Sequence, residues 1–182
     1  RRNKGKSSSE QHAFTEMHDW IHFFDKRPPS FCHVIPPAFI FDYERSAITY
    51  ISPSIAHLIG YENKIFLGTN GIIKFVDLIH PNDFKIYNEQ IFPKEIHLLN
   101  TLSYDKASEL IFSTTLRVNQ VSGTYKTMLM KKGFIINEKS KMPAYEFGIL
   151  QDISAIKKEL SITHTIERFV EAKDCEIGRA HV

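Results

Sequence analysis

The stretch from residue 110 to residue 154 constrains the fold most, because it has the pattern of three consecutive strands separated by short polar breaks. Apolar and polar side chains alternate over residues 112–118, which is the period-two pattern of a half-buried strand. Gly123 lies in the first polar break and can adopt positive φ, so residues 125–136 are expected to fold back as a hairpin. A third apolar run covers residues 144–150. The sequence therefore predicts three adjacent antiparallel strands.

The third run ends in Asp152-Ile153-Ser154, where the Asp152 carboxylate can accept backbone N–H bonds at the start of a helix. Residues 155–172 come next, with apolar side chains near a heptad-like spacing. We predict a helix there that docks on its copy in a dimer. His164 is expected on the solvent-facing side of this helix.

The chain before residue 110 predicts a hairpin followed by helices. Two short β-rich runs, residues 38–43 and 47–51, are separated by a brief polar turn. Residues 54–59 follow as a short helix, and a longer helix is expected from Asp83 with an interruption near Pro93. All the helices of this region therefore fall between the second and the third strand.

This order predicts an α+β fold, in which five strands form one antiparallel sheet and the short helices cover one of its faces. Flanking helices are expected before and after this core. Covering one face of a sheet with short helices produces a cup with an apolar interior. The candidates for its lining are Phe75, Leu78, Tyr87, Phe112, Leu116, Met128, Met130, Phe147 and Ile149. Such residues also form ordinary hydrophobic cores, and no polar group stands out among them, so the sequence names no ligand.

Length and charge limit what this chain can do. A chain of 182 residues that is 42% hydrophobic can bury one core, which favours a single domain. A formal net charge of +2 is too mild to indicate that this segment binds nucleic acid. Residues 1–9 are expected to be a disordered basic tail, and residues 10–37 an amphipathic helix and a linker, followed by the domain at 38–154.

Two further features of the sequence indicate a cytoplasmic protein. No apolar run approaches the roughly 20 residues that a membrane-spanning helix needs, so no membrane association is expected. Cys32 and Cys175 have no close spacing, which predicts neither a disulfide framework nor a zinc site. Two isolated thiols fit a reducing compartment.

Both ends of the chain are expected to be cut. There is no initiator Met, and residues 177–182 correspond codon by codon to a common sequencing-adapter sequence. We therefore expect these six residues to be translated adapter and the gene to continue beyond about Glu176. The predicted signalling helix then belongs to residues 155–176.

Five fragments in order resemble PAS domains over roughly residues 38–158: FIFDYERSAITYIS, PSIAHLIGYE, DLIHPNDF, TTLRVNQVSGTYK and YEFGILQDIS. The last fragment is similar to the Asp-Ile-Thr signature that ends many PAS cores, with Ser154 in the place of Thr. The resemblance implies the PAS fold and a sensory role. More narrowly, the residues resemble PAS domains that precede a LuxR-type helix-turn-helix in regulators of Bacteroidetes, which implies that DNA is bound only by a domain downstream of this segment.

The sequence gives little support for catalysis or for a cofactor. No Ser, His and acid set, no Gly-rich phosphate loop and no metal-ligand spacing is present. His97 is the least implausible axial haem ligand, and neither cysteine has the context of a flavin photosensor. His164 is not followed by the motif of a kinase phosphoacceptor. We expect no catalytic residue, no metal and no cofactor.

The prediction is a non-catalytic PAS sensory or interaction domain, the input half of a cytoplasmic signalling protein, and most simply of a LuxR-type transcriptional regulator. An unknown small molecule or a partner is expected to perturb the sheet, and Asp152, Ile153 and Ser154 pass the change to the exit helix of a homodimer. Three alternatives stay open: the input domain of a sensor histidine kinase, that of a cyclic-nucleotide cyclase, and a stand-alone interaction module.

Overall fold

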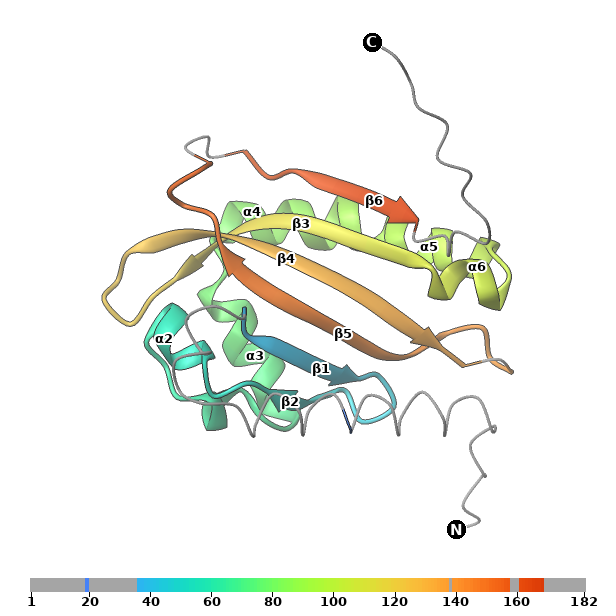
Figure 1. Cartoon of the computed structure of the whole chain (residues 1–182), viewed down its shortest axis with the longest axis horizontal. Coiled ribbons are helices and arrows are strands. Elements are labelled where there is room, and N and C mark those ends of the chain that lie inside the picture. The colour runs from blue at the N-terminus through green and yellow to red at the C-terminus, as the bar shows by residue number, and fades with distance from the viewer. Residues whose placement is uncertain (1–18, 20–35, 138, 158–160, 169–182) are drawn as a thin grey trace, which may run out of the picture.

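An antiparallel sheet with helices on one side forms the body of the protein in a computed structural model (Figure 1). The structure describes residues 19, 36–137, 139–157 and 161–168. The predicted N-terminal tail and helix, and both cysteines, lie outside the described residues apart from Asp19. The predicted α+β class and its one-sided arrangement of helices are confirmed.

The sheet has the strand order β2-β1-β5-β4-β3-β6. Its strands are β1 (Ala38–Asp42), β2 (Ala47–Ile51), β3 (Leu110–Asn119), β4 (Tyr125–Ile136), β5 (Pro143–Asp152) and β6 (His164–Arg168). All neighbouring strands are antiparallel, and the first hairpin joins the later strands through the β1–β5 pairing. The five predicted strands are therefore present, and a sixth extends the sheet beyond β3.

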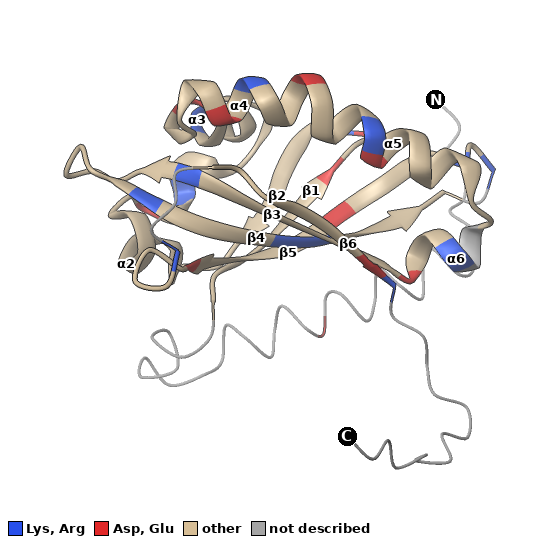
Figure 2. Cartoon of the chain, turned by 90° about the horizontal axis from the view of Figure 1, so that it is seen from above, with Lys and Arg blue, Asp and Glu red and all other residues tan. Residues whose placement is uncertain are grey.

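Seven helical elements connect β2 to β3. They are α2 (Ile55–Ile59), η2 (Asn63–Phe66), α3 (Thr69–Leu78), α4 (Pro81–Ile86), η3 (Tyr87–Ile91), α5 (Phe92–Thr101) and α6 (Tyr104–Ser108). Figure 2 shows α3, α4 and α5 together on one side of the sheet. The sheet and these helices therefore form two layers with the core between them.

Local sequence explains where several helices begin and end. The His80 side chain accepts the N–H of Asn82 as N-cap of α4, and Pro81 occupies the first turn, where its missing N–H costs nothing. Gly60 ends α2 in the left-handed conformation at φ 84°. The long helix expected from Asp83 is interrupted as predicted, and η3, a π-helical turn, lies between α4 and Pro93 in the first turn of α5.

The predicted exit helix is wrong for the described residues that follow β5. Residues 154–156 form a turn, and β6 then pairs antiparallel with β3, with Phe112 opposite Ile166 and Thr114 opposite His164. Two factors favour a strand over the helix that the heptad-like spacing predicted. The segment contains several β-branched residues, which favour extended backbone, and β3 would otherwise present an unpaired edge.

The Asp152-Ile153-Ser154 tripeptide ties the end of β5 to β4. Asp152 accepts the Ser154 N–H at 2.9 Å, as predicted for its carboxylate, but this bond opens a turn and not a helix. Its other oxygen lies 2.8 Å from Lys126 Nζ. The Thr127 N–H donates to Ser154 Oγ at 3.0 Å, and Ile153 donates to the Thr127 carbonyl at 2.9 Å. The tripeptide therefore sets the direction in which the chain leaves the sheet.

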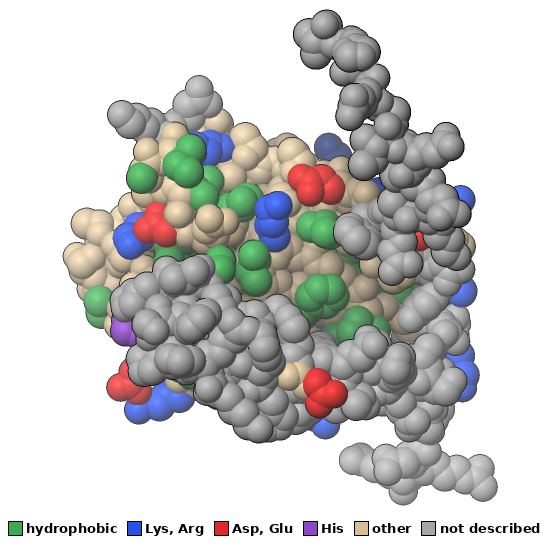
Figure 3. All heavy atoms as spheres, viewed as in Figure 1, with side chains coloured by type: hydrophobic (Ala, Val, Ile, Leu, Met, Phe, Trp, Pro, Cys, Tyr) green, Lys and Arg blue, Asp and Glu red, His purple; other side chains and the backbone are tan. Residues whose placement is uncertain are grey.

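The face of the sheet opposite the helices also carries hydrophobic side chains (Figure 3). Phe147 on β5 is 41% exposed there, and its ring lies over Gly133 of β4, where a Cβ atom would come within 2.8 Å of it. Residues on a strand alternate between the two faces, so Glu146, Gly148 and Leu150 point toward the helices. This alternation decides which side chains of β5 can reach the interior.

Candidate functional site

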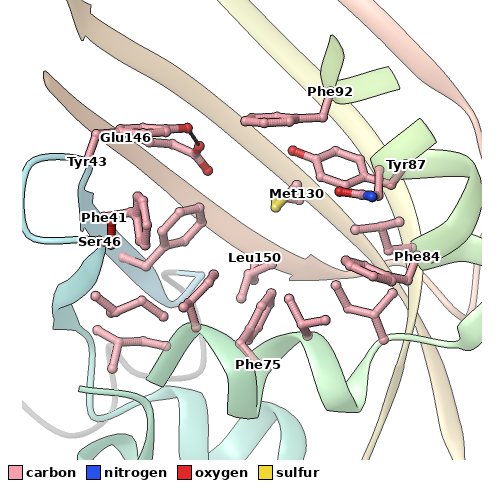
Figure 4. A pocket seen from close by; sticks show the side chains of 18 residues that line it. Phe41, Tyr43, Ser46, Phe75, Phe84, Tyr87, Phe92, Met130, Glu146 and Leu150 are labelled. Atoms are coloured by element: carbon pink, nitrogen blue, oxygen red, sulfur yellow. Dashed lines mark hydrogen bonds between the residues drawn. The ribbon is translucent and has the colours of Figure 1, made fainter. Parts of the chain in front are cut away.

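A cavity of about 320 Å³ lies between the sheet and the helices α3, α4 and η3 (Figure 4). Its hydrophobic lining consists of Phe39, Phe41, Ile48, Ile51, Ile72, Phe75, Val76, Ile79, Phe84, Phe92, Leu116, Met130 and Leu150. Polar groups are contributed by Tyr43, Ser46, Tyr87, Asn88 and Glu146. The volume is near the lower end of the range of about 300 to 1,000 Å³ that small-molecule sites occupy.

Four of the nine candidate lining residues line this cavity: Phe75, Tyr87, Leu116 and Met130. The other five lie elsewhere. Leu78 and Met128 belong to the hydrophobic core around the cavity, and Phe112 belongs to a second core with Leu99 and Phe134. Phe147 and Ile149 are on the opposite face of β5, because a shift of one residue along a strand reverses the face. Between them, Gly148 faces inward against the Phe39 ring.

The residues that sequence reasoning missed come from both the sheet and the helices, and those on β1 and in the turn after it had a recognisable signal. Phe39, Phe41 and Tyr43 all line the cavity, and their period-two spacing was a signal that could have identified them. Glu146 had no such signal, because a glutamate between two aromatic residues of a strand normally faces water.

Glu146 and Tyr43 form the polar end of the cavity. The Tyr43 hydroxyl donates to Glu146 Oε2 at 2.8 Å (Figure 4). Burial, together with the negative charge of Glu146, raises the pKa of Tyr43 far above its ordinary value. Tyr43 is therefore a neutral hydrogen-bond donor to the Glu146 side chain.

Lys132 on β4 lies behind this polar end with its side chain fully buried. Its ammonium is 2.7 Å from Glu95 Oε2 on α5 and 3.8 Å from Glu146 Oε2, and it donates a hydrogen bond to the Tyr87 hydroxyl. Aromatic rings surround the ammonium, with centroids 5.0 Å (Tyr87), 5.5 Å (Phe92) and 5.1 Å (Phe134) away. Carboxylates and ring faces together replace the water that this cation has lost.

Glu95 connects this cluster to the last strand. Burial raises the pKa of Glu95, although Lys132 opposes that shift. Its Oε1 lies 3.8 Å from His164 Nδ1, and that nitrogen is 2.8 Å from Thr114 Oγ1 on β3. Burial lowers the pKa of His164, which favours the neutral ring. The predicted solvent-facing position of His164 is wrong: it lies on β6 with its side chain 19% exposed.

A second ion pair fixes α4 to the sheet beside the cavity. Arg117 on β3 donates to both carboxylate oxygens of Asp83, from Nε at 3.0 Å and from Nη2 at 2.5 Å. The backbone N–H of Arg117 donates to the same carboxylate at 2.8 Å. Although burial alone would raise the pKa of Asp83, these hydrogen bonds from Arg117 lower it below its ordinary value.

Within residues 36–137, 139–157 and 161–168, no group of three or more His, Cys, Asp or Glu side chains is placed to hold a metal ion. Nor does any helix among them have the length and apolarity that spanning a bilayer requires. His97 lies on α5 and does not line the cavity, so it is not placed to ligate a group bound there.

The sheet, its covering helices and the cavity define a protein of the PAS fold, which the resemblance of the five sequence fragments implied. No protein-family model matches the sequence, and no curated protein matches it. Similar solved structures are PAS and LOV domains. The N-terminal domain of a diguanylate cyclase with a PAS/PAC sensor from Marinobacter aquaeolei is 16% identical, with a TM-score of 0.47 over 66% of this chain and 97% of that chain.

Two further solved structures show the same kind of similarity. A sensory box histidine kinase/response regulator from Burkholderia thailandensis is 19% identical, with a TM-score of 0.48 over 67% of this chain and 79% of that one. The LOV domain of a blue-light activated histidine kinase from Erythrobacter litoralis is 16% identical, with a TM-score of 0.45 over 70% of this chain and 99% of that one. At these identities and TM-scores the similarity supports no statement about the ligand or the output of this chain.

Proposed function

We propose that this chain is a non-catalytic PAS sensory domain that binds a small molecule in the cavity and passes the binding event to the segment after β5. It acts as the input part of a cytoplasmic signalling protein, and most simply of a LuxR-type transcriptional regulator. The observation that carries the sensory role is the cavity itself. It is largely apolar, lies between two layers and has the hydrogen-bonded Tyr43 and Glu146 among the polar groups of its wall.

Two routes lead from the cavity to the end of the domain. Leu150 lines the cavity, and β5 continues from it through Gln151 to Asp152, which holds the turn at Ser154. The second route passes through side chains: Tyr87 and Glu146 line the cavity and contact Lys132, and Lys132 pairs with Glu95.

Glu95 in turn lies beside His164, so the second route ends on β6. A ligand that moves Tyr87 or Glu146 changes the surroundings of the buried Lys132 ammonium. Only a ligand with different affinities for two arrangements of these residues can shift their populations. The proposed output is therefore a change in how β6 is held against β3.

Binding in the cavity is tested with a pair of variants on the same helix. Val76→Phe fills space in the cavity wall, whereas Ile73→Phe adds bulk on the exposed side of α3, where Ile73 is 58% exposed. A small-molecule fragment library is screened by thermal unfolding of the full chain. At one hundred times its Kd, a ligand adds about 2.7 kcal/mol of stability, which raises Tm by about 5 to 10 °C for a chain of this size.

Fragments that stabilise the unmodified chain and Ile73→Phe, but not Val76→Phe, support the cavity as the binding site. If no fragment stabilises the unmodified chain, or if Val76→Phe responds equally, the sensory role of this cavity is refuted.

The output domain is proposed from the resemblance of the residues alone. A helix-turn-helix encoded after this segment in the source gene supports a LuxR-type regulator. Kinase or cyclase motifs there support the corresponding enzyme, and a stop codon supports a stand-alone interaction module. We also propose a homodimer through the amphipathic N-terminal segment, residues 10–37, and light scattering on the full chain and on a chain without those residues tests it.

A further inference from the structure

We propose that the cavity binds a compact, mainly apolar amine, with its hydrocarbon part among the aromatic side chains and its protonated nitrogen at Glu146. This inference rests on the proposed sensory function and specifies the chemical class of its ligand. This ligand class follows from the charge at the polar end of the cavity, from the free acceptor positions of Glu146 and from the enclosure of Lys132.

The polar end of the cavity has more acidic than basic groups. Lys132 supplies one positive charge, and Glu95 and Glu146 supply two carboxyl groups around it. Tyr43 and Tyr87 add no positive charge, because burial raises the pKa of both and keeps them neutral. Burial favours the protonated form of Glu95, so Glu146, which lines the cavity whereas Lys132 does not, is the group that a cationic occupant would compensate.

Glu146 is the group that such a cation would reach. Among the described residues that line the cavity, it is the only one with a carboxylate or a basic side chain. Its Oε2 accepts one hydrogen bond from Tyr43 and lies 3.8 Å from Lys132, beyond hydrogen-bond distance. A carboxylate offers about four acceptor positions. Its side chain is 12% exposed and lines the cavity, so Glu146 has free acceptor positions that an occupant of the cavity can use.

The aromatic walls favour the same class of ligand. Phe41 and Phe92 line the cavity on either side of the Glu146 carboxylate in Figure 4, and Phe41 packs edge to face with Tyr43 at 4.9 Å between ring centroids. Ring faces attract cations, and the remaining hydrophobic lining accepts a hydrocarbon chain or ring.

An acidic ligand fits poorly. No described residue that lines the cavity has a basic side chain, and the Lys132 ammonium behind its wall is enclosed by three rings and two carboxylates. An anion would thus meet Glu146 before any positive group. A neutral hydrocarbon would fill the space but leave the free positions of Glu146 without a donor.

Three ligands of nearly equal shape test the proposal on the full chain. 2-Phenylethylamine, 2-phenylethanol and phenylacetate share one ring and differ in the charge of the polar group. Their affinities are measured by calorimetry at neutral pH. We expect the amine to bind about tenfold or more tighter than the alcohol, and the alcohol tighter than the acid, because a hydrogen bond to a charged acceptor gains at least that factor.

Two matched variants assign the effect to one carboxylate. Glu146→Gln is expected to reduce the amine affinity about tenfold and to bring it close to that of the alcohol. Glu44→Gln removes the same charge from the exposed turn next to Tyr43 and is expected to leave all three affinities unchanged. If Glu146→Gln does not fold, the ranking of the three ligands on the unmodified chain carries the test alone.

The outcomes separate this proposal from the sensory function. Equal binding of the three compounds, tighter binding of the acid, or no binding of any of them overturns the amine proposal. If library fragments still stabilise the unmodified chain but not Val76→Phe, the cavity remains a sensory site for another chemical class. If no fragment does so, both proposals fail together.

Discussion

Replacing Lys132 with Met tests the buried cluster most directly. The substitution keeps the approximate length and volume of the side chain and removes the ammonium that lies 2.7 Å from Glu95. Both side chains have no exposed surface, so water cannot replace the lost partner. Glu95 is then left as a buried carboxyl with no cation at contact distance among the described residues, and Glu146 loses its nearest positive charge.

The expected cost follows from this loss of one partner. Removing one member of a buried pair destabilises a protein by about 3 to 5 kcal/mol, because the other charge stays buried without compensation. For a chain of this size that corresponds to a fall in Tm of about 6 to 20 °C. The double variant Lys132→Met with Glu95→Leu removes both charges and is expected to recover most of the loss.

The loss should depend on pH in a defined direction. The pKa of Glu95 is raised in the folded chain, so folding favours its protonated form. A group of this kind contributes stability below its unfolded pKa and loses it as pH rises through the folded pKa. Lys132 holds the pKa of Glu95 down, so the loss of stability with rising pH becomes larger in Lys132→Met. Lys132→Met should therefore be closer to the unmodified chain at pH 5 than at pH 8.

Urea unfolding of the single and double variants at pH 5, 7 and 8 measures these quantities. Lys131→Met is the matched control, because Lys131 is the preceding residue on β4 and points to the opposite face. A change of less than about 1 kcal/mol in Lys132→Met at pH 7, or a double variant no more stable than the single one, would refute the assignment of Lys132 and Glu95 as a coupled buried pair.

Three further changes test other parts of the structure. Arg117→Met leaves the Asp83 carboxylate without its bidentate partner and should cost about 2 to 4 kcal/mol at pH 7, measured by urea unfolding. The pKa of Asp83 is lowered in the folded chain. The Asp83 carboxylate therefore stabilises the fold above its unfolded pKa, and this stabilisation is lost as pH falls through its folded pKa. Arg117→Met should lack this loss of stability in acid. Asp152→Ala should change stability by at most about 1 kcal/mol, because the pair with Lys126 is about one-third exposed, while uncoupling the response of β6 to ligand. Thr115→Val removes a hydroxyl that bonds both Thr163 and Lys157, and should speed amide exchange in β6 but not in β1.

Each of these has an outcome that contradicts it. An unchanged acid unfolding profile in Arg117→Met would show that Asp83 does not depend on that partner. Global unfolding of Asp152→Ala would mean that the tripeptide supports the fold and does not merely direct the exit of the chain. If the β6 amides of the unmodified chain exchange as fast as those of an unfolded peptide, the pairing of β6 with β3 is wrong.

Local sequence pattern predicted the strands and helices correctly where a segment carried only one structural signal. The alternation over residues 112–118 and the turn at Gly123 predicted β3 and β4. The interruption of the long helix followed from Pro93. These features depend on the residue itself and on neighbours within one turn or one strand, so no distant part of the chain could change them.

The exit segment shows where local pattern fails. Residues 161–168 carry both a heptad-like spacing and β-branched residues, so the sequence permits helix or strand. The backbone of β3 decides between them. Pairing with β6 satisfies the N–H and C=O groups along the edge of β3, whereas a helix at residues 161–168 would leave that edge unpaired. That edge is formed by residues about fifty positions earlier, and it exists only after the sheet has assembled.

Periodicity, turns and caps act over a few residues, so the order of strands and helices, the one-sided cover of the sheet and the presence of an apolar interior can all be inferred from local sequence. Long-range packing is needed to determine which side chains face that interior and how their charges combine. Glu95, Lys132 and Glu146 belong to three elements, and the pleat of β5 turns Glu146 inward and Phe147 outward. Whether a buried charge is tolerated depends on partners that folding alone brings within a few ångströms.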